Sequence, residues 1–282
     1  MTPSSSGIAT RDVLSFRCEL LFTHDAQGRM LRVREAEGAI APRFYLGRGP
    51  LYNVWRFRAD LPEALTAALA RLVGKERALP VAAGRLSRDP PWPPPERIEA
   101  FRRLLREHGE IAHEYRGPAF RFPDVIQDVP APEAPGELVR LAGTPRVDRA
   151  LQSLWADSSE ASVAHSGASS RDLFDLSGLP DLPGRPDPQP ETDCFAIVRG
   201  GRIVSACWTS RFLPGKAAEA GVETRSLERG QGHALRVVSA WASAMRQAGV
   251  EPLYSTQWGN APSRAVARKL GLVPMGEDLH FG

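Results

Sequence analysis

The segment from Glu228 to Leu235 has the residue types of a phosphate-binding turn. Gly230 and Gly232 stand between an expected strand and an expected helix over residues 233–247, so successive backbone N–H groups can converge at a helix N-terminus. Arg229 adds a cation beside the turn. The ending of a Walker loop and the third glycine of a dinucleotide fingerprint are both missing. The segment therefore predicts a phosphate or pyrophosphate site, although a Gly-x-Gly turn taken alone is more often only a turn.

A second motif follows, with Asn260-Ala-Pro-Ser263 and then Lys269-Leu-Gly-Leu272. Together with the Arg-x-x-Gly-x-Ala pattern over residues 229–234, it resembles the GCN5-related N-acetyltransferases (GNAT), whose Arg/Gln-x-x-Gly-x-Gly/Ala loop cradles the pyrophosphate of acetyl-CoA. The resemblance covers about residues 137–282. It implies a GNAT fold of the α/β (α+β) class, with a mixed, mostly antiparallel central sheet flanked by helices.

The resemblance also implies where acetyl-CoA, the co-substrate, binds. In the family the fourth and fifth strands part at a bulge, and the pantetheine arm lies in the gap as if it were another strand. The implied cofactor-binding residues are Val222, Glu223 and Thr224 on the strand, Arg229, Gly230, Gln231, Gly232, His233, Ala234 and Leu235 in the loop, and Asn260 and Ser263 in the second motif. Asn260 is also a candidate helix N-cap, and the His233 ring is either a phosphate contact or an ordinary first helical residue.

Two acid/base residues that are common in the family are absent. Many members have a tyrosine seven residues after the asparagine, and here that position is Ala267. Some also have a glutamate five residues before the asparagine, and here that position is Ser255. An ammonium acceptor has a pKa near ~10.4, so its proton must still be removed. Glu223 is the candidate base, directly or through water, although it could equally be a solvated strand residue. Tyr254 and Ser255 are weaker candidates for protonating the thiolate or ordering a water.

Two domains are expected, with a boundary near residue 135 in the proline-rich segment 129–136. Residues 1–135 would form an accessory or acceptor-side α+β domain, and residues 136–282 the GNAT domain. The expected elements of the first are a strand over 14–22 that turns into 31–34, a strand over 55–58, and helices over 64–73 and 95–108. The second would begin with a strand over 138–142, helices from residue 144 and around 159–165, and a long loop to residue 193.

Composition limits the alternatives. The 282 residues carry 36 Lys+Arg and 33 Asp+Glu, interleaved along the chain, so we expect no nucleic-acid partner. The sequence has neither a membrane-length apolar run nor a signal peptide, which favours a cytoplasmic, bacterial-like protein without membrane contact. Three cysteines without a Cys/His cluster indicate no metal site and no disulfide framework. Whether the protein is a monomer or a homodimer is left open.

The sequence thus predicts an acetyl-CoA-dependent N-acetyltransferase whose acceptor is a primary amine of a small molecule or peptide. The amine would attack the thioester directly. The alternative is a catalytically weak CoA-binding sensor or interaction module, because Ala267 and Ser255 replace the usual acid and base. Trp208 and Trp258 are expected in the core, with stacking on a substrate or on the CoA arm as the alternative.

Overall fold

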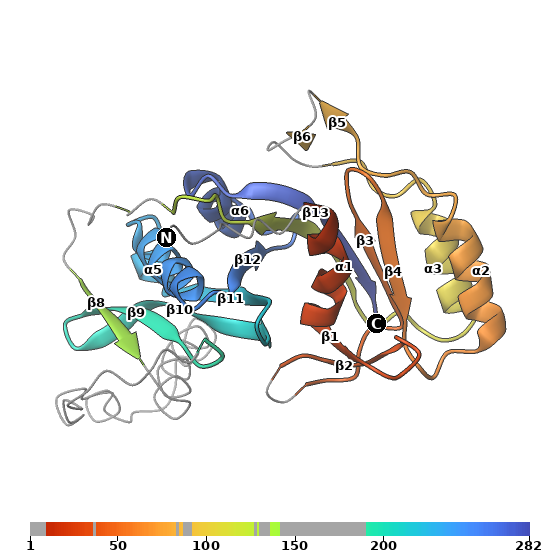
Figure 1. The fold of residues 1–282 in the computed structure, drawn as a ribbon, viewed down its shortest axis with the longest axis horizontal. Helices are drawn as coiled ribbons and strands as arrows, with labels where there is room; N and C mark the ends of the chain where they lie inside the picture. The colour runs from red at the N-terminus through yellow and green to blue at the C-terminus, as the bar shows by residue number, and fades with distance from the viewer. Residues whose placement is uncertain are drawn as a thin grey trace, which may run out of the picture. The chain divides into compact units, whose positions relative to one another are not determined.

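The computed structural model describes residues 10–35, 38–82, 85–86, 92–126, 129, 136–141 and 190–282 (Figure 1). It confirms an α+β fold with a mixed, mostly antiparallel sheet flanked by helices. The elements in chain order are α1 Thr10–Leu21, β1 Phe22–His24, β2 Met30–Val33, β3 Phe44–Arg48, β4 Asn53–Phe57, α2 Glu63–Val73, β5 Val81–Ala82, β6 Arg85–Leu86, α3 Ile98–Arg106, β7 Glu114–Arg121, β8 Glu137–Leu141, β9 Cys194–Arg199, β10 Arg202–Leu213, β11 Ala217–Thr224, the 3₁₀ turn η2 Ser226–Glu228, α5 His233–Gln247, β12 Glu251–Ser255, α6 Ala261–Lys269 and β13 Val273–Phe281.

The chain forms two compact units. The first comprises Met1–Arg121 together with Tyr254–Gly282, and the second comprises Phe122–Leu253. The C-terminal segment returns to the first unit because β13 pairs antiparallel with both β7 and β3. The boundaries of these units differ from the boundary expected near residue 135. The assignment of domains 1–135 and 136–282 therefore stays a prediction.

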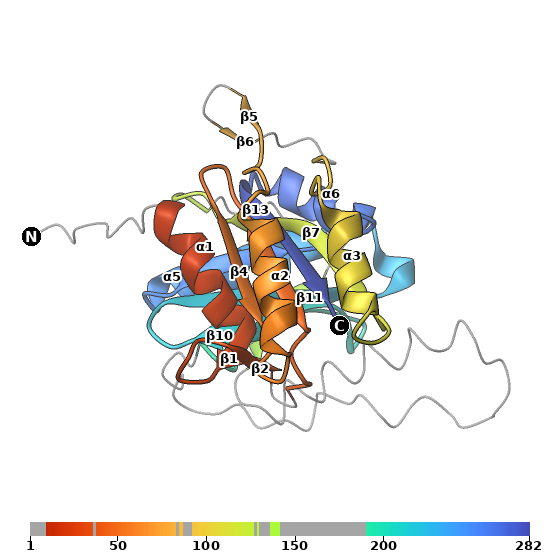
Figure 2. The same cartoon turned by 90° about the vertical axis from the view of Figure 1, so that its right-hand side faces the viewer.

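Helices cover both faces of the sheet in the first unit. Its strands follow the order β4, β3, β13, β7, and all the pairs are antiparallel. Helices α2 and α3 lie side by side against one face, and α1 lies on the other (Figures 1 and 2). Alternate residues of the strands therefore enter two separate cores, because successive side chains of a strand point to opposite faces.

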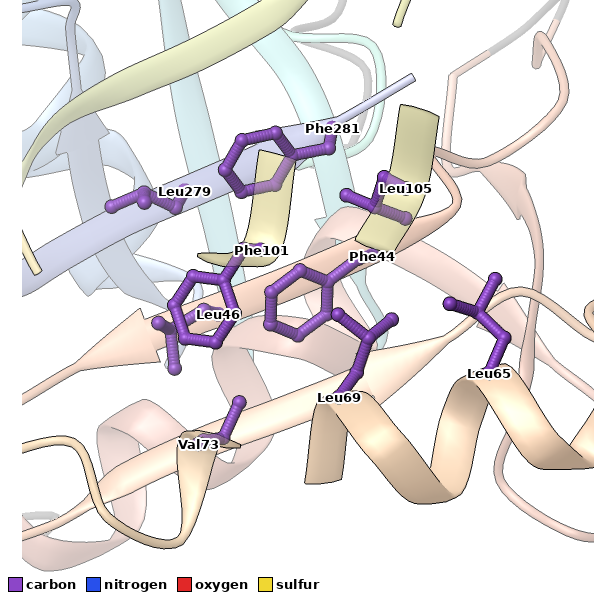
Figure 3. Packing of buried hydrophobic residues seen from close by; sticks show 9 residues of the cluster. All are labelled: Phe44, Leu46, Leu65, Leu69, Val73, Phe101, Leu105, Leu279 and Phe281. Atoms are coloured by element: carbon purple, nitrogen blue, oxygen red, sulfur yellow. The ribbon is translucent and has the colours of Figure 1, made fainter. Parts of the chain in front are cut away.

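The core under α2 and α3 is built mainly from aromatic and leucine side chains (Figure 3). The ring of Phe44 stacks on that of Phe281, with centroids 5.8 Å apart, and meets Phe101 edge-on at 5.3 Å. The buried members of this cluster are Phe44, Leu46, Leu65, Leu69, Val73, Phe101, Leu105, Leu279 and Phe281. Side chains from the C-terminal strand thus complete a core that the N-terminal elements begin.

The strand expected over residues 14–22 is wrong, because α1 is a helix as far as Leu21. Leu14, Cys18 and Leu21 are buried at the i, i+4, i+7 spacing of a helix face. The apolar residues 14, 16, 18 and 20 also alternate with polar ones, which is the pattern of a strand. Arg17, one of those polar residues, has no exposed side-chain surface, so this alternation does not mark a buried and a solvent-facing side.

A buried ion pair fixes α1 to the sheet of the first unit. Arg17 Nε donates to Asp278 Oδ2 at 2.7 Å, and Tyr45 Oη donates to Asp278 Oδ1 at 2.9 Å. Arg17 and Asp278 have 0% and 1% of their side-chain surface exposed. Burial, followed by the Asp278 charge, holds the pKa of Tyr45 well above its ordinary value. The hydroxyl therefore stays protonated and donates a hydrogen bond to the carboxylate.

The second unit contains β8 to β11 and the start of β12 from the expected GNAT half, whereas β13 of that half belongs to the first unit. β8, β9, β10 and β11 pair antiparallel in this order, and β11 pairs with β12 in parallel. Helix α5 contacts β9, β10 and β11 and covers one face of these strands (Figure 1). Trp241 of α5 marks this face, because its Nε1 donates to Thr209 Oγ1 at 3.0 Å.

Most other expected elements are confirmed within a few residues. They include the β1–β2 hairpin, β4, α2, α3, β8 and α5 with the expected bounds. β3 and β7 were not predicted from the sequence. The expected helices at residue 144 and around 159–165, and nearly all of the expected loop to residue 193, lie outside the described residues.

Candidate functional site

Strand β11 has an unpaired edge in the second unit. On one side β10 pairs with it over its whole length, from Ser205 opposite Thr224 to Leu213 opposite Ala217. On the other side β12 pairs only with residues 217–219. Residues 220–224 therefore lack a strand partner on that side, among the described residues of this unit.

The peptide groups of Val222 and Thr224 point to this edge. Arg225 N donates to Val204 O at 2.9 Å, and hydrogen-bonded pairs alternate along an antiparallel ladder. Glu223 is accordingly bonded to β10, whereas its two neighbours direct their N–H and C=O groups away from it. In agreement, Thr224 O accepts a hydrogen bond from the Arg229 side chain, Nε to O 3.2 Å. An extended ligand could hydrogen-bond along this edge as a further strand.

The edge leads into the glycine loop predicted from the sequence. Gly230 and Gly232 have φ values of +83° and +82°, which residues with a Cβ rarely adopt. Gly232 is the N-cap of α5, and the first amides of a helix have no intrahelical acceptor. These amides and the helix dipole favour an anion at this end of the 15-residue helix.

Arg229 and Glu223 pair beside the loop. Arg229 Nη2 lies 3.2 Å from Glu223 Oε1, and their side chains are 54% and 31% exposed. An ion pair this exposed contributes about 0–1 kcal/mol. An anionic ligand with several oxygens could therefore replace Glu223 as the partner of Arg229 with only a small loss of free energy.

Gln231 and Glu228 fix the loop to β9. Arg199 Nη1 lies 3.0 Å from Glu228 Oε2 and 3.3 Å from Gln231 Oε1. Gln231 Nε2 in turn donates to Leu227 O at 3.5 Å. The side chain of Gln231 therefore supports the loop, and its peptide group is the part that is available to a ligand.

The His233 ring does not fit the phosphate contact considered from the sequence. The residue is 1% exposed, and its Nε2 lies 3.6 Å from Glu228 Oε2. Burial lowers the pKa of His233, although Glu228 opposes this shift. A buried, neutral ring cannot reach a ligand in solvent, so only its backbone N–H could serve a phosphate. Ala234 and Leu235 continue the same first turn of α5.

The remaining predicted site residues lie in the first unit. Asn260 Oδ1 accepts from Ser263 N at 3.1 Å, which confirms its N-cap role at α6. Tyr254 is 1% exposed, and its hydroxyl lies 2.6 Å from Ser263 Oγ. This contact gives no support to Tyr254 as the acid that protonates the thiolate. Ser255, at the end of β12, is half-buried. Ala267, at the position of the family tyrosine, is buried.

One close contact near Glu223 was not predicted from the sequence. A Cβ added to Gly221 would lie 2.5 Å from Cε2 of Trp208, so the indole lies directly over this glycine. The only signal was the glycine itself, inside an expected strand, where it can mark a close approach of another group.

Neither a metal site nor a membrane helix emerges from the described residues. No cluster of three His, Cys, Asp or Glu side chains there could hold a metal ion. Likewise, none of the helices in that part of the chain combines the length and apolar character needed to cross a bilayer. Cys18, Cys194 and Cys207 are buried as free thiols.

Residues 194–277 match the family model described as GNAT acetyltransferase. This segment contains the β11 edge, the glycine loop and the Asn260 motif. The match confirms, over this C-terminal segment, the resemblance to the GNAT family found in the sequence. No curated protein matches the chain.

Several solved structures described as GNAT proteins are similar to the chain at low identity. A GCN5-related N-acetyltransferase from Kribbella flavida is 19% identical over 99% of this chain and 96% of its own, with a TM-score of 0.47. A GCN5-related N-acetyltransferase-like protein from Streptococcus suis is 16% identical over 86% and 85%, with a TM-score of 0.44. The chain spans 65% of a GNAT-family protein from Novosphingobium aromaticivorans, at 16% identity and a TM-score of 0.41.

Proposed function

We propose that the protein is an acetyl-CoA-dependent N-acetyltransferase that acts on a primary amine of a small molecule or peptide. One observation carries the proposal, namely that the unpaired edge of β11 continues directly into the glycine loop at the start of α5. A single stretch of chain from residue 220 to residue 235 therefore offers strand-like peptide groups followed by anion-binding amides. Acetyl-CoA has these two parts in the same order, an amide-containing arm and a pyrophosphate.

The residues of the second unit fit this cofactor. Val222 and Thr224 would hydrogen-bond the pantetheine arm through their outward peptide groups. The amides that follow Gly230, with the Arg229 guanidinium, would hold the pyrophosphate. Bound acetyl-CoA supplies the thioester whose carbonyl carbon is attacked. Asn260 and Ser263 stay predicted contacts of the arm, and a cytoplasmic location also stays a prediction.

Glu223 is the proposed base. The amine nitrogen forms a bond to the acetyl carbon while the C–S bond breaks, and Glu223 accepts the proton that the nitrogen loses, directly or through a water. The departing thiolate of CoA takes a proton in turn, from solvent or from an ordered water. Because Ala267 stands where the family has its tyrosine, the positioning of the amine and thioester would account for most of the rate acceleration.

A matched pair of glycine variants tests the cofactor assignment. Gly230→Ala and Gly249→Ala both force a Cβ onto positive φ, +83° and +73°, and neither Cβ meets an atom within 4 Å. The intrinsic strain is therefore similar, about 1–2 kcal/mol. Only Gly230→Ala should weaken acetyl-CoA binding, measured as thermal stabilisation and by titration calorimetry. Arg229→Glu should weaken it about 10- to 100-fold, the value of a charge-assisted hydrogen bond of about 1.5–3 kcal/mol. Equal effects of the two glycine variants would contradict the assignment.

A CoA-binding sensor or interaction module is the second candidate. The buried alanine at position 267 and the engagement of the Tyr254 hydroxyl with Ser263 favour it, because they remove two sources of a proton for the thiolate. Release of CoA thiol with a panel of primary amines separates the two candidates. Turnover that falls at least tenfold in Glu223→Gln supports the enzyme, whereas binding of acetyl-CoA without turnover on any amine supports the sensor.

A further inference from the structure

The side chain of His233 is buried in the glycine loop without a hydrogen bond. None of its side-chain surface is exposed, and within the described part of the chain neither Nδ1 nor Nε2 has a hydrogen-bond partner. Glu228 Oε2 lies 3.6 Å from Nε2, which is too long for a hydrogen bond. Buried polar groups without partners are uncommon because they destabilise the fold. An imidazole differs from the apolar residues that usually fill buried positions because it can take up a proton near neutral pH.

The position of His233 connects its ring to the anion site. His233 follows the N-cap Gly232 and is the first residue of α5. Its backbone N–H is one of the free amides at this helix end, and its ring is buried within the same turn. A charge on a ligand at these amides therefore acts on the ring over a short distance, although the ring does not touch the ligand. Salt screens interactions of buried groups only weakly.

Charged groups from three elements surround the ring. Glu228 of η2 favours the protonated imidazole, whereas Arg236 of α5 and Arg199 of β9 oppose it. Arg199 also pairs with Glu228 at 3.0 Å, which offsets part of the carboxylate charge. Before β8, Gly136 faces the ring without a charge, since a Cβ there would lie 4.0 Å from His233 Cε1. Burial, the two arginines and the positive end of the helix dipole thus keep the ring neutral in the absence of a ligand.

A bound pyrophosphate reverses this balance. It offsets the positive end of the helix dipole and adds negative charge beside the ring, and both changes favour the imidazolium. A protonated Nε2 could then donate to Glu228 Oε2 after a small movement that shortens their 3.6 Å separation. Ligand binding and proton uptake at His233 would therefore favour each other.

We propose that His233 is a proton-linked regulator of the glycine loop, which takes up a proton when a pyrophosphate-containing ligand binds and makes that binding tighter at lower pH. This inference rests on the proposed function, because acetyl-CoA is the ligand that this function assigns to the loop. The affinity should rise as the pH falls through the pKa of the ring in the complex. It should level off below the pKa of the ring in the free protein, which burial holds below the ordinary value of 6.5.

Titration calorimetry with CoA between pH 8 and pH 5.5 tests the proposal without requiring turnover. The phosphate monoester of CoA also titrates in this range, so the measured quantity is the difference between the unmodified protein and His233→Gln. Over this range the unmodified protein should gain about 3- to 30-fold more affinity than the variant, as follows for a charge at a helix terminus. His233→Met is a second variant without a titratable group and should behave in the same way. His108→Gln is the control, since His108 is an exposed histidine of the first unit, and it should keep the full pH dependence.

Two further measurements distinguish a proton-linked role from a merely structural one. The NMR signal of the Cε1 proton that is lost in His233→Gln should titrate at higher pH with CoA than without it. Glu228→Gln should shift the pH dependence of CoA affinity to lower pH, because it removes the charge that favours the imidazolium. An unchanged pH profile in this variant would contradict the proposed pairing of the ring with Glu228.

The outcomes separate this inference from the proposed function. Equal pH profiles for the unmodified protein and His233→Gln, with CoA still bound, would overturn the inference and leave the cofactor assignment intact. A ring titration that CoA does not shift would have the same meaning. Proton-linked binding of CoA without turnover on any amine supports the inference and contradicts the proposed acetyltransferase. Absence of CoA binding at every pH contradicts both.

Discussion

Replacement of Asp278 by asparagine should strongly destabilise the first unit. Arg17 Nε and Nη2 lie 2.7 and 2.6 Å from Asp278 Oδ2, and Tyr45 Oη donates to Oδ1 at 2.9 Å. Asparagine keeps the shape of the side chain but removes the negative charge that Arg17 Nε and Nη2 contact. Removing one partner of a buried ion pair costs about 3–5 kcal/mol. Tyr45→Phe should cost less, about 1.5–3 kcal/mol, since it removes one hydrogen bond to a charged group.

Two measurements check these values. Urea unfolding followed by circular dichroism gives the free energy of unfolding, and hydrogen exchange of the peptide Thr10–Leu21 shows whether α1 is the element that loosens. The matched control is the double variant Arg17→Met with Asp278→Leu. Because it removes both charges together but leaves the Tyr45 hydroxyl without its acceptor, it should lose less stability than Asp278→Asn, about 1–3 kcal/mol.

Either of two results would refute this reasoning. A loss below about 1 kcal/mol for Asp278→Asn would mean that Arg17 is not held as a buried charge. A double variant as unstable as the sum of its two single variants would mean that the pair is not coupled.

Three further outcomes are expected. The lowered pKa of His233 disfavours the protonated ring in the folded state, so its contribution to stability is complete above the ordinary value of 6.5 and is lost as the pH falls below it. Thermal melts of His233→Gln between pH 7 and 5 should thus depend less on pH than those of the unmodified protein. Asn260→Ala should cost about 1 kcal/mol in urea unfolding through the lost cap of α6. Burial raises the pKa of Cys194 to about 12 and also raises that of Cys207, so a thiol reagent should label neither in the folded protein at pH 8 and both in urea. Rapid labelling of the folded protein would contradict their burial.

The second unit was well predicted because its signals are local. Each of these signals, namely Gly230, Gly232 and the apolar spacing of α5, is recognisable within a few residues of the chain. The loop and the helix lie where the sequence predicts them. The edge of β11 was inferred from family resemblance alone. The pairing of residues 217–219 with β12 now gives that edge a structural basis.

The first unit was less predictable because its order depends on distant partners. The burial of Arg17 depends on Asp278, which is 261 positions away in the sequence and gives no local signal. β3 is buried along its whole length and carries no alternating pattern, so period-two spacing could not reveal it. The close contact of Trp208 with Gly221 was hidden for another reason. A glycine in a strand can indicate that another group approaches closely, but its sequence position does not identify which side chain that is.

The return of β13 to the first unit affects the order in which the chain can fold during synthesis. Leu279 and Phe281 complete the core begun by Phe44 and Leu46, so the N-terminal elements leave the ribosome long before their last packing partners exist. Domains whose segments are contiguous in sequence can fold as they emerge, whereas this one must wait until the second unit has been made. Until then an apolar sheet surface lacks its cover, and exposed apolar surface of this kind makes a partly synthesised chain prone to aggregation.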